Sequence, residues 1–166
     1  VPKLRAALLE AQEKLREDGS FPVIILISGV DGSGKGDTIN TLYEWMDPRY
    51  MSTRTFSAPT QEERQRPSMW RFWRALPKKG RIGIAAGSWY SWPVADRIAG
   101  DLSRSDFDQR MDELNRFEEM LVNEGALVLK FWIHLSKDAQ RERLASIEAN
   151  PLTRWRVTKA SWDRLK

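Results

Sequence analysis

The apolar positions of the chain follow two spacings, and together they predict strands that alternate with helices. Segments that are apolar with almost no polar interruption are typical of strands buried on both faces of a parallel sheet. Segments with apolar residues at helical spacing and charges between them predict amphipathic helices. The predicted strands cover residues 21–28, 52–57, 81–86 and 126–135, and the predicted helices cover 2–17, 38–46, 61–76 and 106–124, with two further helices beginning at Ser136 and after Arg156.

This order predicts an α/β fold with a parallel sheet, because strands joined through helices pair in parallel with right-handed crossovers. In such sheets the ligand lies beyond the carboxyl ends of the strands. Three separate segments, at Gly29, Ser57 and Ser88, fall at that edge. His134 lies inside the last predicted strand, so we expect it to be a hydrogen-bonded core residue and not a catalytic base.

The glycines that follow the first strand have the spacing of a P-loop. The pattern Gly29-x4-Gly34-Lys35 comes directly after the buried strand and leads into a predicted helix. Glycines allow backbone N–H groups to turn inward around phosphate oxygens, and the helix directs its positive end at the same point. Lys35 would neutralise the outer phosphates, and the alternative is a glycine-rich turn without a ligand. The candidate phosphate- and nucleotide-binding residues are Gly29, Gly32, Ser33, Gly34, Lys35, Gly36, Thr38 and Ser88.

One position of this loop departs from the usual pattern. Gly36 stands where a Ser or Thr hydroxyl normally holds Mg²⁺. Asp31 inside the loop and Thr38 in the following helix are the nearest groups that could hold the metal instead. A carboxylate inside a phosphate loop repels phosphate unless a cation lies between them. Asp31 is therefore the first candidate for a metal ligand, and Asp31 and Lys35 are the candidate catalytic residues.

Length and composition exclude several classes of protein. The 166 residues suffice for one domain, residues 1–166, and the start at Val1 and the end inside a predicted helix suggest a piece of a longer chain. With no cysteine and one histidine, neither a disulfide framework nor a zinc site is expected. No apolar run reaches the roughly 20 residues of a membrane helix and no secretory signal is visible, so we expect a cytoplasmic protein. The net charge of +4 favours a polyanionic partner without requiring one.

Several motifs resemble those of the polyphosphate kinase 2 family, in order and over nearly the whole chain. They are Gly29-x-Asp31-x-x-Gly34-Lys35-Gly36, the segments 54–63, 70–77, 80–84 and 129–137, and Ser88-Trp89-Tyr90. The resemblance implies a P-loop kinase-like three-layer αβα sandwich with a helical lid. It also implies phosphoryl transfer between inorganic polyphosphate and a nucleoside mono- or diphosphate such as AMP or ADP, with Mg²⁺ as the cofactor. Within the family the chain resembles the polyphosphate:AMP phosphotransferases, whose chains fuse two such domains.

Two positions depart from the pattern of active family members. These members usually carry an acid or amide and then an arginine just before Ser-x-Tyr, and the acid serves as a second metal-binding group. Here the two positions are Ala86 and Gly87. Phosphoryl transfer depends on positioning and charge neutralisation, and one cationic group at the transition state is worth about a thousandfold in rate. Asp37 also stands where the family often has glycine. The alternative function is therefore a catalytically degenerate domain of a tandem enzyme.

Basic residues offer three further sets of phosphate contacts. Arg154 and Arg156 resemble a basic motif of the family, and residues 92–118 are the predicted lid, with Arg97, Arg104, Arg110 and Arg116 available on closure. For the third set, a polyphosphate track and a solvated helix face are equal alternatives. The candidate track residues are Arg64, Arg66, Arg71, Arg74, Lys78 and Lys79.

Three functions remain open at this stage. They are an active polyphosphate-dependent nucleotide kinase, a non-catalytic domain that pairs with an active copy or only binds polyphosphate, and an ATP-dependent P-loop kinase for a small molecule. The expected partners are polyphosphate, AMP or ADP, and either a second similar domain or another copy of the chain. Neither a membrane nor a nucleic acid is expected.

Overall fold

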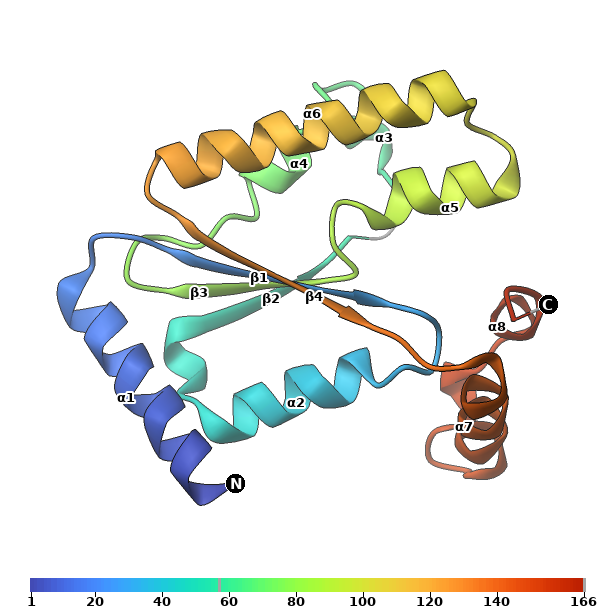
Figure 1. Cartoon of the computed structure of the whole chain (residues 1–166), viewed down its shortest axis with the longest axis horizontal. Helices are drawn as coiled ribbons and strands as arrows, with labels where there is room; N and C mark the ends of the chain where they lie inside the picture. Colours follow the sequence, from blue (N-terminus) through green and yellow to red (C-terminus); the bar gives the residue numbers. More distant parts are fainter. Residues whose placement is uncertain (57, 166) are drawn as a thin grey trace.

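A parallel sheet of four strands forms the middle layer of the fold, in a computed structural model that describes residues 1–56 and 58–165 (Figure 1). Helices α1 and α2 cover one face of the sheet, and α3, α4, α5 and α6 lie on the other. The elements are α1 (Pro2–Asp18), β1 (Val23–Gly29), α2 (Lys35–Trp45), η1 (Pro48–Tyr50), β2 (Met51–Thr55), α3 (Gln61–Arg64), α4 (Trp70–Trp73), β3 (Ile82–Ala86), α5 (Ser91–Ala99), α6 (Arg104–Asn123), β4 (Leu127–Ile133), α7 (Lys137–Ala149), η2 (Arg154–Arg156) and α8 (Lys159–Asp163).

The strand order is β2-β3-β1-β4, and each neighbouring pair runs parallel. Strand β1 lies between β3 and β4 and is buried along residues 23–28, as its uninterrupted apolar sequence requires. Because all four strands run the same way, their carboxyl ends meet at one edge of the sheet. The predicted α/β fold with a parallel sheet and a helical layer on each face is confirmed.

Alternate residues of β1 serve two separate cores, since successive side chains of a strand point to opposite faces. Ile25 and Ile27 pack in the core beneath α1 and α2, which also holds Leu15 and Ile84. On the other face Ile24 and Leu26 pack in a second core. This second core contains an aromatic cluster in which Phe72, Trp89 and Phe117 meet with ring centroids 5.2–6.3 Å apart.

Two predictions from the periodicity are wrong. The single helix predicted over 61–76 is two four-residue helices, α3 and α4, with Pro67 between them. Proline lacks the N–H that a helix interior needs, and it disfavours the helical conformation of the residue before it. His134 is not a core residue either, because it follows the end of β4 and is exposed. The predicted strand end at Ser57 lies outside the described residues.

Strand β4 is more exposed than its apolar sequence suggests. It has β1 as its one neighbour among the described strands, and Phe131 and Trp132 are 52% and 61% exposed. One side of it is open, as expected for a strand at an edge, although Leu129 and Ile133 pack against the core beneath α1 and α2. Across the residues that the structure describes, no helix has both the length and the apolar content to cross a bilayer.

Candidate phosphate-binding site

The loop after β1, residues 29–36, has a backbone that only glycine adopts without strain at three positions. Gly29, Gly32 and Gly34 have φ angles of 149°, 74° and 94°. A Cβ atom on Gly29 would also lie 2.1 Å from the backbone oxygen of Ile133, so no side chain fits there. These requirements explain the glycine spacing in the sequence. We call residues 29–36 the glycine loop.

Helix α2 begins directly at the end of the glycine loop. Its N-cap is Gly34, which offers no side chain to satisfy the first N–H groups of the helix. The N–H group of Thr38 donates a hydrogen bond to Gly34 O at 2.9 Å. The N–H groups of the preceding turn have no intrahelical acceptor, and they carry the positive end of the helix dipole. This helix end can therefore bind an anion.

Lys35 folds back over the glycine loop. Its Nζ atom donates hydrogen bonds to the carbonyl oxygens of Gly29 at 2.7 Å and Val30 at 2.8 Å. Burial lowers the pKa of Lys35 below its usual value of 10.5, and the nearby Asp31 carboxylate opposes this shift. The two carbonyl groups thus hold the ammonium at the loop, and a bound anion would oppose the lowering of its pKa.

Three arginines from the C-terminal part of the chain close the site. A cavity of about 330 Å³ lies between the glycine loop and the segment from α7 to α8. Arg143 comes from α7, Arg156 from η2 and Arg164 from the residue after α8. Arg156 lies close to the start of α2, because a Cβ atom on Gly36 would meet its Nη2 atom at 3.2 Å. Cationic side chains therefore surround the helix end from outside the loop.

Two carboxylates of the site are paired with these arginines. Oδ2 of Asp31 accepts hydrogen bonds from Nε and Nη2 of Arg164 at 2.8 and 2.5 Å. Asp37 accepts a hydrogen bond from Arg143, and its other oxygen lies 3.8 Å from Nη2 of Arg156. Across the cavity, four cationic side chains face two carboxylates. The site keeps a net positive charge.

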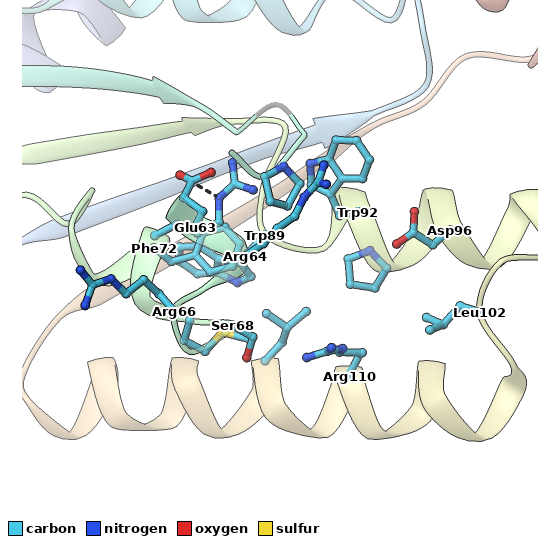
Figure 2. A pocket seen from close by; sticks show the side chains of 15 residues that line it. Glu63, Arg64, Arg66, Ser68, Phe72, Trp89, Trp92, Asp96, Leu102 and Arg110 are labelled. Atoms are coloured by element: carbon cyan, nitrogen blue, oxygen red, sulfur yellow. Dashed lines mark ion pairs between the residues drawn. The ribbon is translucent and has the colours of Figure 1, made fainter. Parts of the chain in front are cut away.

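A second and larger cavity lies on the opposite face of the sheet, between α3, α4, α5 and α6. Its volume is about 580 Å³, and Figure 2 shows aromatic and charged side chains around it. The rings of Phe72, Trp89 and Trp92 line it together with Arg64, Arg66, Arg71 and Arg110. Arg71 contributes to the wall but is already held, since its Nε atom lies 3.6 Å from Glu63 and its guanidinium lies over Phe56.

A buried carboxylate fixes the segment that connects β3 to this second cavity. Glu118 of α6 accepts hydrogen bonds from Nε1 of Trp89 at 3.0 Å, from the Tyr90 hydroxyl at 2.8 Å and from Nζ of Lys130 at 2.7 Å. Burial together with this contact raises the pKa of Tyr90 to about 12. Lys130 belongs to β4, so one side chain ties α6, the end of β3 and β4 together.

The family model for polyphosphate kinase 2 (PPK2) matches residues 1–166 of the chain. The chain belongs to the polyphosphate kinase 2 family. A polyphosphate:AMP phosphotransferase of Pseudomonas aeruginosa is 49% identical over 164 residues, which is 99% of this chain and 33% of that protein. An AMP/ADP-polyphosphate phosphotransferase of Meiothermus ruber is 31% identical and is matched over 62% of its length.

A solved structure agrees with this membership. The crystal structure of the polyphosphate kinase 2 of Arthrobacter aurescens TC1 superposes with a TM-score of 0.91 at 27% identity, over 97% of this chain and 58% of that one. The polyphosphate:AMP phosphotransferases of P. aeruginosa and Pseudomonas syringae are each three times as long as the matched segment, since the chain spans 33% of both.

For this family member, the structure separates the predicted phosphate-binding residues. Residues 31–36 line the smaller cavity, with Asp31 and Lys35 among them. Ser88 does not reach it, because Ser88 is fully buried and its hydroxyl is hydrogen-bonded to that of Ser28 at 2.6 Å. Thr38 is exposed beyond the cavity, and its hydroxyl donates to Gly34 O. Binding by these residues stays a prediction.

The six residues of the predicted polyphosphate track lie in different surroundings, and their binding of polyphosphate stays a prediction. Arg64, Arg66 and Arg71 line the larger cavity, and Arg74 stacks on the ring of Trp70 at 4.7 Å. Lys78 and Lys79 precede β3 and therefore lie at the amino edge of the sheet, opposite the glycine loop. The sequence also gave no signal for Arg143 and Arg164 at the smaller cavity, whereas Arg156 belongs to the basic motif at 154–156.

The residues at the glycine loop do not fit the Mg²⁺ that the resemblance implies. P-loop enzymes hold this metal with a loop hydroxyl and an acid from a neighbouring strand. Gly36 and Ala86 supply neither group here, and Asp31 is engaged by Arg164. In the parts of the chain that the structure describes, no three His, Cys, Asp or Glu residues are grouped to hold a metal. The side-chain oxygen donors that line the cavity in the described residues are two carboxylates, Asp31 and Asp37, both paired with arginines, and the hydroxyls of Ser33, Thr158 and Ser161.

Proposed function

We propose that this chain is a phosphotransferase domain of the polyphosphate kinase 2 type, which moves phosphoryl groups between inorganic polyphosphate and AMP or ADP. The observation that carries the proposal is the glycine loop at the carboxyl end of β1, with Lys35 folded over it and a cationic cavity in front of it. The identity of the substrates is taken from the names of the relatives. The chain spans 33% of the first of those relatives, so their activity is part of the proposal for this chain.

The larger cavity is suited to the second substrate of this reaction, the nucleotide. Aromatic rings suit a nucleobase, and the arginines beside them suit its phosphate. The cavity is bounded by α5 and the first part of α6, which together make up most of the predicted lid at 92–118. Closing this segment over a nucleotide would exclude water from the transferred group. Lid movement, a cytoplasmic location and pairing with a second domain stay predictions.

In this proposal the smaller site supplies positive charge and orients the phosphoryl group that is transferred. Amide groups at the start of α2 and the ammonium of Lys35 would hold the phosphoryl oxygens, where fixed donors stabilise the charge that spreads over them during transfer. The end of β3 adds no charge, because the strand ends at Ala86 and Gly87 follows it. Turnover should therefore be far below that of a family member with both charged groups.

A second candidate function is favoured by the same missing charges. It is a non-catalytic domain that binds polyphosphate and pairs with an active copy. Restoring the charges with the double substitution Ala86→Asp and Gly87→Arg distinguishes the two. Ala86 lies on the same face of the sheet as Ile84, and this face is covered by α2, so an aspartate at position 86 would point to the α2 side. Gly87 has a φ of 71°, so the arginine costs about 1–2 kcal/mol in strain, but its Cβ would meet nothing closer than 3.6 Å.

The assay is phosphoryl transfer from polyphosphate to AMP or ADP, followed by phosphorus NMR. A rate from the wild-type chain that disappears in Lys35→Ala supports transfer by this domain. No rate from the wild type, with a rate in the double variant, supports the non-catalytic candidate. Faster transfer from ATP than from polyphosphate would contradict both and would support a small-molecule kinase.

A further inference from the structure

The acidic residue of the glycine loop already has a cation beside it. A carboxylate next to a phosphate site repels the ligand, and Asp31 lies in the wall of the cavity. The side chain that neutralises it is Arg164, which contacts the same carboxylate oxygen through two nitrogens. The two residues are 133 positions apart in the chain, so the fold brings the arginine here.

The three cavity arginines can take phosphate oxygens as partners beside their carboxylates. Their side chains are 40–60% exposed, and Asp31 and Asp37 are 31% and 48% exposed. Ion pairs as exposed as these contribute little to stability, so phosphate oxygens can compete for the guanidinium groups. Guanidinium binds phosphate through parallel hydrogen bonds, which ammonium cannot do.

A buried hydroxyl in the same loop has no partner of its own. Ser33 lines the cavity, and within residues 1–56 and 58–165 its Oγ atom is buried without a hydrogen bond. Such orphaned groups are rare in folded proteins and call for an explanation such as a missing ligand. A phosphate oxygen at the mouth of the loop would satisfy this hydroxyl together with the open N–H groups of α2.

From these observations we propose that the glycine loop binds the terminal phosphates of a polyphosphate chain without a divalent cation, with Arg164 supplying the positive charge beside Asp31. Arg143 and Arg156 complete the cationic wall. This inference rests on the phosphate-binding role proposed above, and it deepens that role by naming how the charge is neutralised. It holds for an active and for a non-catalytic domain alike.

The experiment is calorimetric titration of the chain with inorganic tripolyphosphate, once in EDTA and once in Mg²⁺. Binding in EDTA should equal or exceed binding in Mg²⁺, because the metal neutralises the free ligand. Arg164→Gln should weaken binding in EDTA about threefold to tenfold. The matched control is Arg141→Gln, since Arg141 is on the same helix as Arg143 but pairs with Asp138 outside the cavity. The control should bind like the wild type.

Asp31→Asn gives a result that loss of folding cannot imitate. Removing the carboxylate frees Arg164 and removes a repulsive charge, so tripolyphosphate should bind about threefold to tenfold more tightly in EDTA. If Asp31 holds a metal instead, the substitution will weaken binding in Mg²⁺, and the inference fails. Wild-type binding that vanishes in EDTA overturns it too, while leaving the phosphate-binding role intact. No binding in either buffer overturns that role itself.

Discussion

Replacing Glu118 with alanine should destabilise the chain by about 3 kcal/mol, because a buried acceptor for three donors is lost. Trp89 is 2% exposed, so its indole N–H would be left unpaired, which costs about 1–3 kcal/mol. The hydrogen bond from Tyr90 to a charged group adds about 1–2 kcal/mol. Lys130 adds little, since its side chain is 54% exposed and can be hydrated.

Urea denaturation of Glu118→Ala, Glu118→Gln and a control measures this effect. The glutamine variant keeps one acceptor and should lose about 1–2 kcal/mol. The control is Glu119→Ala, the next residue of α6, which is exposed and should change stability by less than about 0.5 kcal/mol. If Glu118→Ala and the control have the same unfolding free energy, the carboxylate does not anchor the end of β3, and the reasoning is refuted.

Three further results are expected. Gly29→Ala should cost about 2 kcal/mol more than Gly100→Ala, by thermal denaturation, because both glycines have positive φ but only Gly29 meets a backbone oxygen of β4. As the pH is raised, the affinity for tripolyphosphate should begin to fall before pH 10.5, because burial lowers the pKa of Lys35 and the neutral amine no longer attracts anions. In Lys35→Arg the affinity should stay constant over the same pH range. Ser88→Ala should destabilise by about 1–2 kcal/mol by orphaning the buried Ser28 hydroxyl, and the double alanine variant should lie closer to the wild type.

Local patterns of the sequence were enough for the strands and the loop. The apolar run of β1 predicts a buried strand, and the glycines after it predict a loop that only glycine can form. Both inferences rely on neighbouring residues. The break of the predicted helix 61–76 was also local, since Pro67 is visible, but the apolar and charged spacing on either side of it concealed the interruption.

Contacts between distant parts of the chain decide what local patterns missed. His134 follows a strand that has one described neighbour, and no spacing reveals which strand lies at the edge. Arg143 reaches Asp37 from 106 residues away, and Arg164 reaches Asp31 from 133 residues away. Before the fold is known, an arginine in a C-terminal helix has no feature that separates a phosphate contact from a surface ion pair.

The most direct test of the account is a nitrogen–proton NMR titration of the chain with inorganic tripolyphosphate. If the glycine loop holds the phosphates, the largest shifts will be at the backbone amides of residues 32–36, and Lys35→Ala will abolish them. Shifts confined to residues 64–74, with the loop amides unmoved, would show that the phosphates bind at the larger cavity alone and would contradict the account.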